Sequence, residues 1–298
     1  MAEFPGAGQT RFESALQSTF VLLTDTQRDR IEVVLVSPRN PLNIGAAARA
    51  MANFGFAHLA VVAPYEPHWG EAKSAIGADE LLQSARITER LTDAVADCTL
   101  VVGTGSLQHR KPEQPVIPLP DLVPLIQKEI ARGGRIALVF GSEKRGLTQT
   151  DLSHCHLLAV IPTHPKQPSM NLGQAVAVCL YELSARLSLP ARESGGPDPA
   201  LPRTDISLSS HATSLLGTSE SAPNAAPPAS TRDLELLAGL VEESMLAANY
   251  SPPAMRNANR SDLNLLLRRL SLSRGDAGRI LGFFRRILWR LKHESNRK

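Results

Sequence analysis

The chain of 298 residues has no run of about 18 consecutive apolar residues, the length that a helix needs to cross a bilayer. Its first apolar run, Phe20–Leu23, is too short for the core of a secretory signal peptide and lies among polar residues. We therefore expect no membrane span and no signal peptide, and we interpret residues 1–29 as a flexible leader. With 43% hydrophobic and 20% charged residues, the composition is typical of a soluble globular protein.

Cysteine is scarce, and the three that occur are Cys98, Cys155 and Cys179, with no Cys-x-x-Cys pair. An odd number of scattered cysteines indicates reduced, buried thiols in a cytosolic protein. The cluster His154–His156 is the one segment that resembles a metal site. Adjacent residues of an extended segment point to opposite faces, so these three side chains do not converge on one ion. We expect no metal.

The chain also lacks the dinucleotide-binding fingerprint G-x-G-x-x-G. Gly103 and Gly105 supply its first two glycines, but Gln108 stands where the third is required. This absence argues against a nucleotide-binding dehydrogenase, the first alternative for a chain of alternating strands and helices.

Short apolar runs alternate with helical patterns between residues 30 and 189. The expected strands are Ile31–Val36, Leu59–Ala63, Thr99–Val102, Arg135–Phe140 and Leu157–Ile161. The expected helices are Ile44–Asn53, with Asn43 as N-cap and Gly55 as its end, Asp121–Arg132 and Asn171–Leu187. Strands that are apolar throughout and separated by helices predict an α/β fold, with a mainly parallel sheet flanked by helices.

The composition changes abruptly at residues 190–230, which hold seven prolines, eight serines and three glycines. Such a segment buries too little apolar surface to offset the ordering of its backbone, so we interpret it as a flexible linker. Two helical patterns follow, Leu234–Ala248 and a second one around residues 280–291. They predict a small helical domain over residues 231–298.

The helical domain carries most of the positive charge. Residues 256–298 contain twelve Lys or Arg and three acidic residues, a net charge of +9, whereas the rest of the chain sums to −6. A local excess of this size is typical of a surface that binds a polyanion, although a solvated helix face is the plainer alternative.

Three segments that follow expected strands carry unusual residues. In residues 40–51, Asn43 and Arg49 lie on a helix of small residues. In residues 140–147, Gly141 and Gly146 stand five apart, and residues 161–173 bring Ser169 and Asn171 through a proline-rich loop to a helix start. Each feature has an ordinary structural explanation on its own: a surface arginine, a tight turn and an N-cap.

Together and in this order, the three segments resemble the three motifs of the SpoU-type SPOUT methyltransferases. The most similar group is the TrmJ-like one, which modifies position 32 of the tRNA anticodon loop. The matching residues are Asn43 and Arg49, then Phe140, Gly141, Glu143, Gly146 and Leu147, then Ser169–Asn171, where Met170 replaces the usual leucine. The resemblance covers about residues 31–188 and extends more loosely to the basic tail.

The resemblance implies a sheet whose C-terminal part is tied into a trefoil knot, a homodimer, and S-adenosylmethionine held in the knot. The implied cofactor-binding residues are Thr104, Gly105, Ser106, Gly141, Ile161, Pro168, Ser169 and Met170. The implied catalytic residues are Arg49, Asn43, Glu143, Ser169 and Asn171.

The implied reaction is 2′-O-ribose methylation of RNA, and not of DNA, in the cytoplasm. Arginine is essentially always protonated, so we interpret Arg49 as a cation that holds a phosphate and stabilises the emerging alkoxide, rather than as a base. Ser169 and Asn171 would orient the ribose and the loop. Glu143 would position Arg49 or its neighbours.

Several basic residues are candidate contacts to RNA phosphates. They are Arg110, Lys111, Lys144, Arg145, Arg268, Arg269, Arg285 and Arg286. Two alternatives stay open: ribosomal RNA as the substrate, and a non-catalytic RNA-binding protein on the same scaffold.

Overall fold

The structure, a computed structural model, describes residues 24–65, 74–105, 112–187, 226–250, 252 and 255–295. Within these ranges seven strands form one sheet in which every pairing is parallel, as predicted. The strands are β1 (Ile31–Val36), β2 (His58–Val62), β3 (Arg86–Thr88), β4 (Leu100–Thr104), β5 (Val116–Pro118), β6 (Ile136–Phe140) and β7 (Leu157–Val160). Their order is β3-β2-β1-β6-β4-β7-β5.

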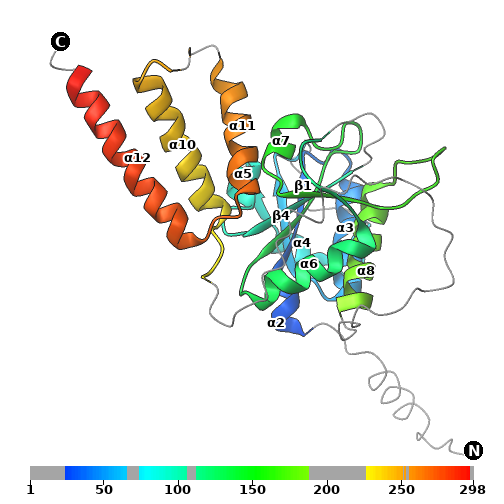
Figure 1. The fold of residues 1–298 in the computed structure, drawn as a ribbon. Helices are drawn as coiled ribbons and strands as arrows, with labels where there is room; N and C mark the ends of the chain where they lie inside the picture. Colours follow the sequence, from blue (N-terminus) through cyan, green and yellow to red (C-terminus); the bar gives the residue numbers. More distant parts are fainter. Residues whose placement is uncertain are drawn as a thin grey trace, which may run out of the picture.

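Helices cover both faces of the sheet (Figure 1). They are α3 (Pro41–Phe54), α4 (Asp79–Gln83), α5 (Leu91–Ala94), α6 (Leu119–Ala131), α7 (Gln149–Ser153) and α8 (Leu172–Leu187). The short helix α2 (Asp25–Arg28) precedes β1 and buries none of its residues. Alternate residues of β1 enter two cores: Leu35 packs with α3, α6 and α8, and Val34 packs with α5 and α7. This alternation explains why β1 is apolar along nearly its whole length.

The first turn of α3 differs from the prediction. Asn40, not Asn43, caps the helix, because its side chain accepts a hydrogen bond from Leu42 N at 3.0 Å and Pro41 occupies the first helical position. Proline is favoured there since its missing N–H has no partner in a helix. The predicted end is correct: Gly55 adopts a left-handed φ of 74°. The side chain of Asn43 is therefore available for other contacts.

The last residues of the predicted leader, 24–29, lie against the sheet domain, which we define as residues 24–187. Within them, a capping box between Thr24 and Gln27 begins α2. Asp29 lies 3.5 Å from His58, and the Arg28 side chain lies against Gly55. Residues 1–23 lie outside the described residues.

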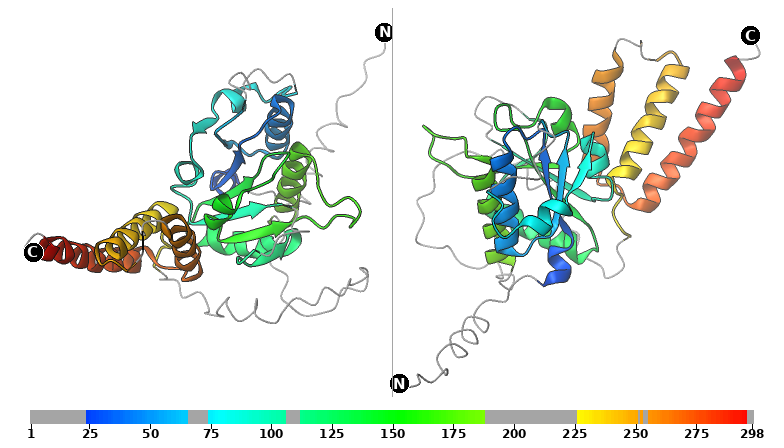
Figure 2. Two further views of the ribbon diagram at one scale, coloured as in Figure 1. Left: turned by 90° about the horizontal axis from the view of Figure 1, so that it is seen from above. Right: turned by 180° about the vertical axis from the view of Figure 1, so that it is seen from behind.

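A helical unit, defined here as residues 226–295, follows the sheet domain. It contains α10 (Thr231–Ala247), α11 (Arg256–Arg269) and α12 (Arg274–Ser295), one helix more than the two predicted patterns. Figures 1 and 2 show α10 between its two neighbours and α12 farthest from the sheet. Its core is apolar and consists of Ala229, Leu234, Leu237, Ala238, Leu267 and Ala277.

The end of the predicted linker also belongs to this unit. Ala229 N donates to Leu272 O at 2.9 Å, and Arg274 N donates to Pro227 O at 2.8 Å, so residues 227–230 are fixed against the start of α12. The rest of the predicted linker, residues 190–225, lies outside the described residues. None of the described helices is long and apolar enough to span a membrane. The trefoil knot stays a prediction.

The helical unit docks on the sheet domain through the start of α10. Thr231 N and Oγ1 both donate to Cys98 O, at 2.8 and 3.0 Å, and Arg232 N donates to Ala96 O at 2.9 Å. Cys98 precedes β4 by two residues, so this contact lies near the amino end of that strand.

Candidate active site

The predicted cofactor-binding residues gather at one edge of the sheet. Thr104 ends β4, Gly141 follows β6 and Ile161 follows β7, and these three strands are neighbours in the order β6-β4-β7. Because the strands are parallel, their carboxyl ends meet at the same edge, where open α/β sheets bind ligands. Gly105 is exposed there, and Ser106 lies outside the described residues.

The loop after β6 is as tight as its two glycines predict. A Cβ atom on Gly141 would lie 2.1 Å from the carbonyl carbon of Gly146 and 2.2 Å from the nitrogen of Leu147. Gly146 adopts a φ of 64° and donates to Ser142 O at 2.8 Å. Any side chain at Gly141 would force this turn open, so the position requires glycine.

The loop after β7 carries the third predicted segment. Thr163 Oγ1 donates to Pro168 O at 3.2 Å, which ties the start of the loop to its end. Ser169 is exposed, whereas Pro168 and Met170 are half-buried. The loop therefore presents Ser169 next to the first turn of α8.

Three side chains, one from each predicted segment, form a hydrogen-bonded chain. The Glu143 carboxylate accepts from Asn43 Nδ2 at 2.8 Å, and Asn43 Oδ1 accepts from Asn171 Nδ2 at 2.8 Å. Asn171 Oδ1 in turn accepts from Gly173 N at 2.9 Å and from Gln174 N at 3.3 Å, so Asn171 caps α8 as predicted.

Strand order explains why Glu143 meets α3. Because β1 pairs directly with β6, the turn after β6 lies beside the turn after β1. The Glu143 carboxylate accepts there from Arg39 N at 2.9 Å and from Asn40 N at 3.1 Å. The sequence motifs did not single out these two backbone donors; the Asn-Pro pair at positions 40 and 41 is the signal that indicates a turn there.

These donors fix the charge of Glu143. Partial burial raises the pKa of its carboxyl group, but the hydrogen bonds from Asn43 and from the backbone of Arg39 and Asn40 outweigh burial and leave the pKa below its usual value. Glu143 is therefore an anion at neutral pH, with three donors already bound, and its geometry suits positioning rather than proton transfer.

Arg49 stands apart from this chain. It is exposed on α3, six residues after Asn43, and makes no hydrogen bond or ion pair within the described part of the chain. Six residues correspond to about 9 Å along a helix axis. Glu143 thus binds Asn43 and not Arg49, and the guanidinium is free to meet a ligand.

Small residues let α3 and α8 pack closely beside each other (Figure 2). A Cβ atom on Gly173 would lie 2.6 Å from Ala46 Cβ. Ala47 and Ala48 are fully buried in the core cluster on this face of the sheet. This packing brings Asn171, at the start of α8, to Asn43.

Apart from Arg268, the predicted RNA contacts fall into three groups. Lys144 and Arg145 are exposed in the turn after β6, next to Glu143. Arg269 is exposed on α11, and Arg285 and Arg286 are exposed on α12. Arg110 and Lys111 lie outside the described residues.

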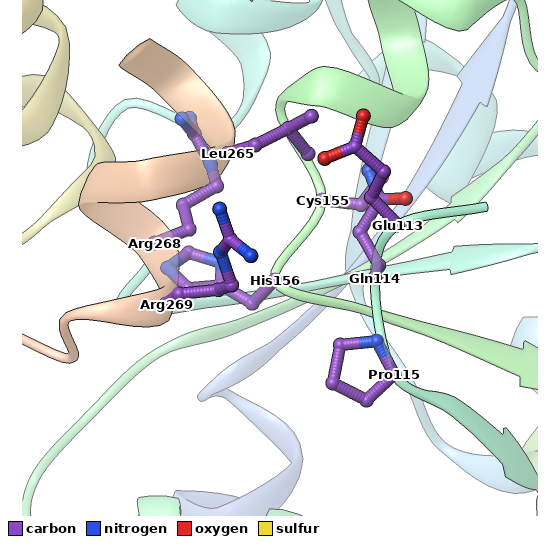
Figure 3. A pocket seen from close by; sticks show the side chains of 8 residues that line it. All are labelled: Glu113, Gln114, Pro115, Cys155, His156, Leu265, Arg268 and Arg269. Atoms are coloured by element: carbon purple, nitrogen blue, oxygen red, sulfur yellow. The ribbon is translucent and has the colours of Figure 1, made fainter. Parts of the chain in front are cut away.

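The prediction that Arg268 contacts RNA is wrong, because its side chain is buried and only 2% exposed. Arg268 Nη2 donates to Glu235 Oε1 at 3.1 Å and Arg268 Nε donates to His154 O at 2.9 Å. Figure 3 shows Arg268 beside His156, where α11 meets the sheet domain. It joins the two parts of the protein and does not reach RNA in this conformation.

The two histidines of the segment His154–His156 bind different partners. His154 Nδ1 lies 3.0 Å from Glu235 Oε1, and His156 Nδ1 accepts from Val101 N at 3.0 Å. Burial, and then the charge of Arg268, lower the pKa of His156 to about 3, so this histidine is neutral. Burial raises the pKa of Cys155 to about 12, which leaves its thiol protonated.

Comparison with known proteins places these features in a family. The model of the SpoU rRNA Methylase family matches residues 30–181, just over half of the chain. The chain belongs to the SpoU rRNA methylase family. The matched region contains the whole sheet with Asn43, Glu143 and Asn171, and ends within α8.

Named relatives share this region. The chain is 39% identical over 156 residues to the tRNA (cytidine/uridine/adenosine-2′-O-)-methyltransferase TrmJ of Pseudomonas aeruginosa, covering 52% of this chain and 60% of that protein. It is 34% identical over 178 residues to the tRNA (cytidine-2′-O-)-methyltransferase TrmJ of Methanocaldococcus jannaschii, covering 57% and 77%. The chain thus spans less than two thirds of the length of the first of these relatives.

A solved structure extends the likeness to the helical unit. The crystal structure of TrmJ from Z. mobilis ZM4 matches with a TM-score of 0.67 and 27% identity, over 86% of this chain and 98% of that chain. The sheet domain alone makes up much less than this share, so the match to this structure includes the helical unit as well as the sheet.

Proposed function

We propose that the protein transfers the methyl group of S-adenosylmethionine to a ribose 2′-hydroxyl of RNA, with tRNA as substrate and position 32 of the anticodon loop as target. The observation that carries this proposal is the chain Glu143–Asn43–Asn171, which joins all three motif segments at the carboxyl edge of the sheet. The names of the two TrmJ relatives support the substrate class.

The loops at this edge fit the cofactor. The turn at Gly141 leaves no room for a side chain, so backbone atoms can approach a ligand there. The residues that would hold the cofactor are Thr104, Gly105, Ser106, Gly141, Ile161, Pro168, Ser169 and Met170. The cofactor would supply a methyl group on a sulfonium centre, which is a good leaving group.

As the O–CH3 bond forms and the S–CH3 bond breaks, the 2′-hydroxyl would lose its proton to water. The protein must mainly align the 2′-oxygen with the methyl carbon and stabilise the negative charge that develops on that oxygen. Arg49 is the group for this task, since its exposed guanidinium has five donors and stays charged. It would hold a phosphate and the 2′-oxygen together. Ser169 would orient the ribose, and Glu143 would act as a positioning residue that fixes Asn43 and, through it, Asn171.

The helical unit would bind a second part of the RNA. Its exposed arginines include Arg269, Arg285 and Arg286, whereas its contact with the sheet domain lies at the amino end of β4. The five residues of β4 separate that end from the candidate site by about 17 Å, at about 3.3 Å per residue. A folded RNA is large enough to contact both surfaces.

A homodimer is part of the proposal. Leu42 on α3 is 54% exposed and Tyr181 on α8 is 59% exposed, and Phe54 packs edge-on against Tyr181 with ring centroids 6.2 Å apart. These apolar groups lie on the helices that carry Asn43, Arg49 and Asn171. A second copy that covered them would border the site. Action in the cytoplasm, where tRNA is modified, completes the proposal.

The decisive experiment is methylation of unmodified tRNA and rRNA transcripts with labelled S-adenosylmethionine, followed by mapping of the product. We expect label at a ribose 2′-oxygen of the tRNA anticodon loop. Label in rRNA alone would identify rRNA, and not tRNA, as the substrate. RNA binding without transfer to either RNA would favour the non-catalytic alternative, and stabilisation by NADH but not by S-adenosylhomocysteine would favour a dehydrogenase.

A further inference from the structure

Arg39 and Tyr65 form a stacked pair beside the candidate site that no step of the proposed reaction uses. Arg39 lies in the turn after β1, and Tyr65 lies in the turn after β2, the neighbouring strand. The carbon at the centre of the Arg39 guanidinium lies 4.6 Å from the centroid of the Tyr65 ring. Both side chains therefore stand at the same carboxyl edge of the sheet as Glu143.

Backbone hydrogen bonds hold this pair in place. Ser37 N donates to Val62 O at 2.8 Å and Tyr65 N donates to Pro38 O at 3.1 Å, so the two turns are fixed to each other. Arg39 N donates to Glu143 Oε2 at 2.9 Å, the same carboxylate that binds Asn43. The pair is thus connected to the Glu143–Asn43–Asn171 chain through one carboxylate.

Packing does not explain the pair. The Tyr65 side chain is 64% exposed, and neither residue belongs to the hydrophobic cores of the described structure. A cation–π contact between two exposed side chains contributes little to stability. A flat ring and a flat guanidinium held at the rim of a site do, however, offer two faces on which a planar group can stack.

We propose that Tyr65 and Arg39 form a platform that stacks an unpaired base of the RNA next to the methylated nucleotide. The inference rests on the proposed function. Proteins read single-stranded loops of RNA by stacking unstacked bases on aromatic rings and on guanidinium planes. A platform with an adjacent cation suits a nucleotide, because the base meets the ring and its phosphate meets the charge.

The test compares Tyr65→Ala and Tyr65→Phe with the wild-type full-length protein. Tyr250→Ala is the matched control, because Tyr250 is 78% exposed on the helical unit and outside the site. The readouts are KM and kcat for tRNA, the quenching of 2-aminopurine in a short single-stranded RNA, and the rise in Tm with S-adenosylhomocysteine. The last readout reports whether the cofactor loops stay intact.

We expect Tyr65→Ala to raise KM for tRNA and the Kd for the short RNA by about tenfold or more, the scale of one lost stacked base. The kcat at saturating tRNA should change by less than about threefold, since the platform binds and does not react. Tyr65→Phe and Tyr250→Ala should stay near wild type. Arg39→Ala should weaken binding in the same direction as Tyr65→Ala while keeping the backbone donor to Glu143.

Two outcomes would overturn the platform: an unchanged KM and unchanged quenching in Tyr65→Ala, or a loss in Tyr65→Phe equal to that in Tyr65→Ala, which would make the hydroxyl the contact. A failure of the proposed function is distinguishable. If the wild type bound the short RNA with quenching that Tyr65→Ala abolished, yet transferred no methyl group to any RNA, the platform would stand and the methyltransferase proposal would fall.

Discussion

Arg49 and Glu143 carry opposite charges near the same helix, yet they do not pair. Glu143 binds Asn43 and two backbone N–H groups, so its charge is already satisfied. The guanidinium of Arg49 is left exposed and without an anion from the described chain. An exposed cation on the helix that begins at the ligand-binding edge suits an anionic ligand, and an RNA phosphate beside a developing alkoxide meets that requirement.

The first prediction concerns this guanidinium. Arg49→Ala should abolish methyl transfer and leave the binding of S-adenosylhomocysteine nearly unchanged. Arg49→Lys should stay impaired by about a hundredfold or more, because lysine keeps the charge but loses the planar pair of donors. Single-turnover rates and thermal shifts measure the two effects.

Arg132→Ala is the control for Arg49, since Arg132 lies just after α6 and its only described ion pair is a loose contact of 3.9 Å with Glu129. It should behave as wild type. Near-normal turnover of Arg49→Ala in an intact protein would show that another group stabilises the 2′-oxygen.

The second prediction separates two roles of Asn171. Asn171→Ala loses the cap of α8 and the donor to Asn43, so it should cost about 1 kcal/mol of stability as well as activity. Asn171→Asp keeps an acceptor for the cap but has no donor for Asn43. It should therefore unfold at nearly the wild-type denaturant concentration while transferring methyl groups slowly.

Denaturant unfolding and initial rates, measured on the same preparations, check this prediction. Full activity of Asn171→Asp would mean that the link between Asn43 and Asn171 is dispensable. The resemblance could name these residues as a set. It could not predict their mutual bonds, which depend on β6 lying beside β1 and on Asn40 capping α3, since both are properties of the folded chain.

At the scale of elements, the sequence predicted the long apolar ones and missed the short or charged ones. All five expected strands are present within two residues of their expected bounds. The strands β3 and β5 have three residues each and lie at the two edges of the sheet. β3 reads Arg-Ile-Thr, and β5 reads Val-Ile-Pro between further prolines, so neither has the length or pattern that predicts a strand. The helix α11 was missed because arginine and asparagine make up much of it, although Leu267 faces the core.

The helix α11, which the sequence analysis missed, carries two arginines that bind Glu235 where the helical unit meets the sheet domain. Glu235 on α10 accepts from Arg260 at 2.9 Å and from Arg268 at 3.1 Å, both on α11, and lies 3.0 Å from His154 of the sheet domain. Removing this carboxylate leaves the buried Arg268 without an anion, which is more costly than losing an exposed pair.

The third prediction follows from this network. Glu235→Ala should lower the free energy of unfolding by about 3–5 kcal/mol, the usual cost of breaking a buried ion pair. The control is Glu243→Ala, because Glu243 and Lys292 form an exposed pair at 2.8 Å that contributes less than about 1 kcal/mol. Urea unfolding curves measure both. Equal losses in the two variants would contradict the role of Glu235.

The same network predicts an acid-sensitive junction. Burial raises the pKa of Glu235, but the hydrogen bonds and charges of His154, Arg260 and Arg268 outweigh it and lower the pKa to about 2. A depressed pKa means that the stabilisation is complete above the unfolded-state pKa and is lost as the pH falls toward 2. The stability difference between wild type and Glu235→Gln should therefore shrink as the pH falls from 6 to 3.

At the scale of the whole molecule, the sequence placed positive charge on the tail but could not predict how the tail docks. The bonds from Thr231 and Arg232 end on the carbonyls of Cys98 and Ala96, which have no side-chain pattern to announce them. In the docked arrangement α12 is the helix farthest from the sheet, and α10 lies between α12 and α11 (Figure 1). The exposed arginines of α12 therefore face solvent far from the sheet core, where a large polyanion can reach them.

The last prediction tests this second surface in the full-length protein. The double variant Arg285→Ala/Arg286→Ala should weaken tRNA binding and reduce the slope of log K against log salt by about 1 to 2, because each lost phosphate contact removes roughly one unit. Unfolding and S-adenosylhomocysteine binding should not change, since both side chains are exposed. Arg90→Ala is the control, because Arg90 is exposed on the sheet domain and paired with Asp93 at 3.1 Å. A slope unchanged in the double variant and reduced in Arg90→Ala would move the RNA surface from α12 to the sheet domain.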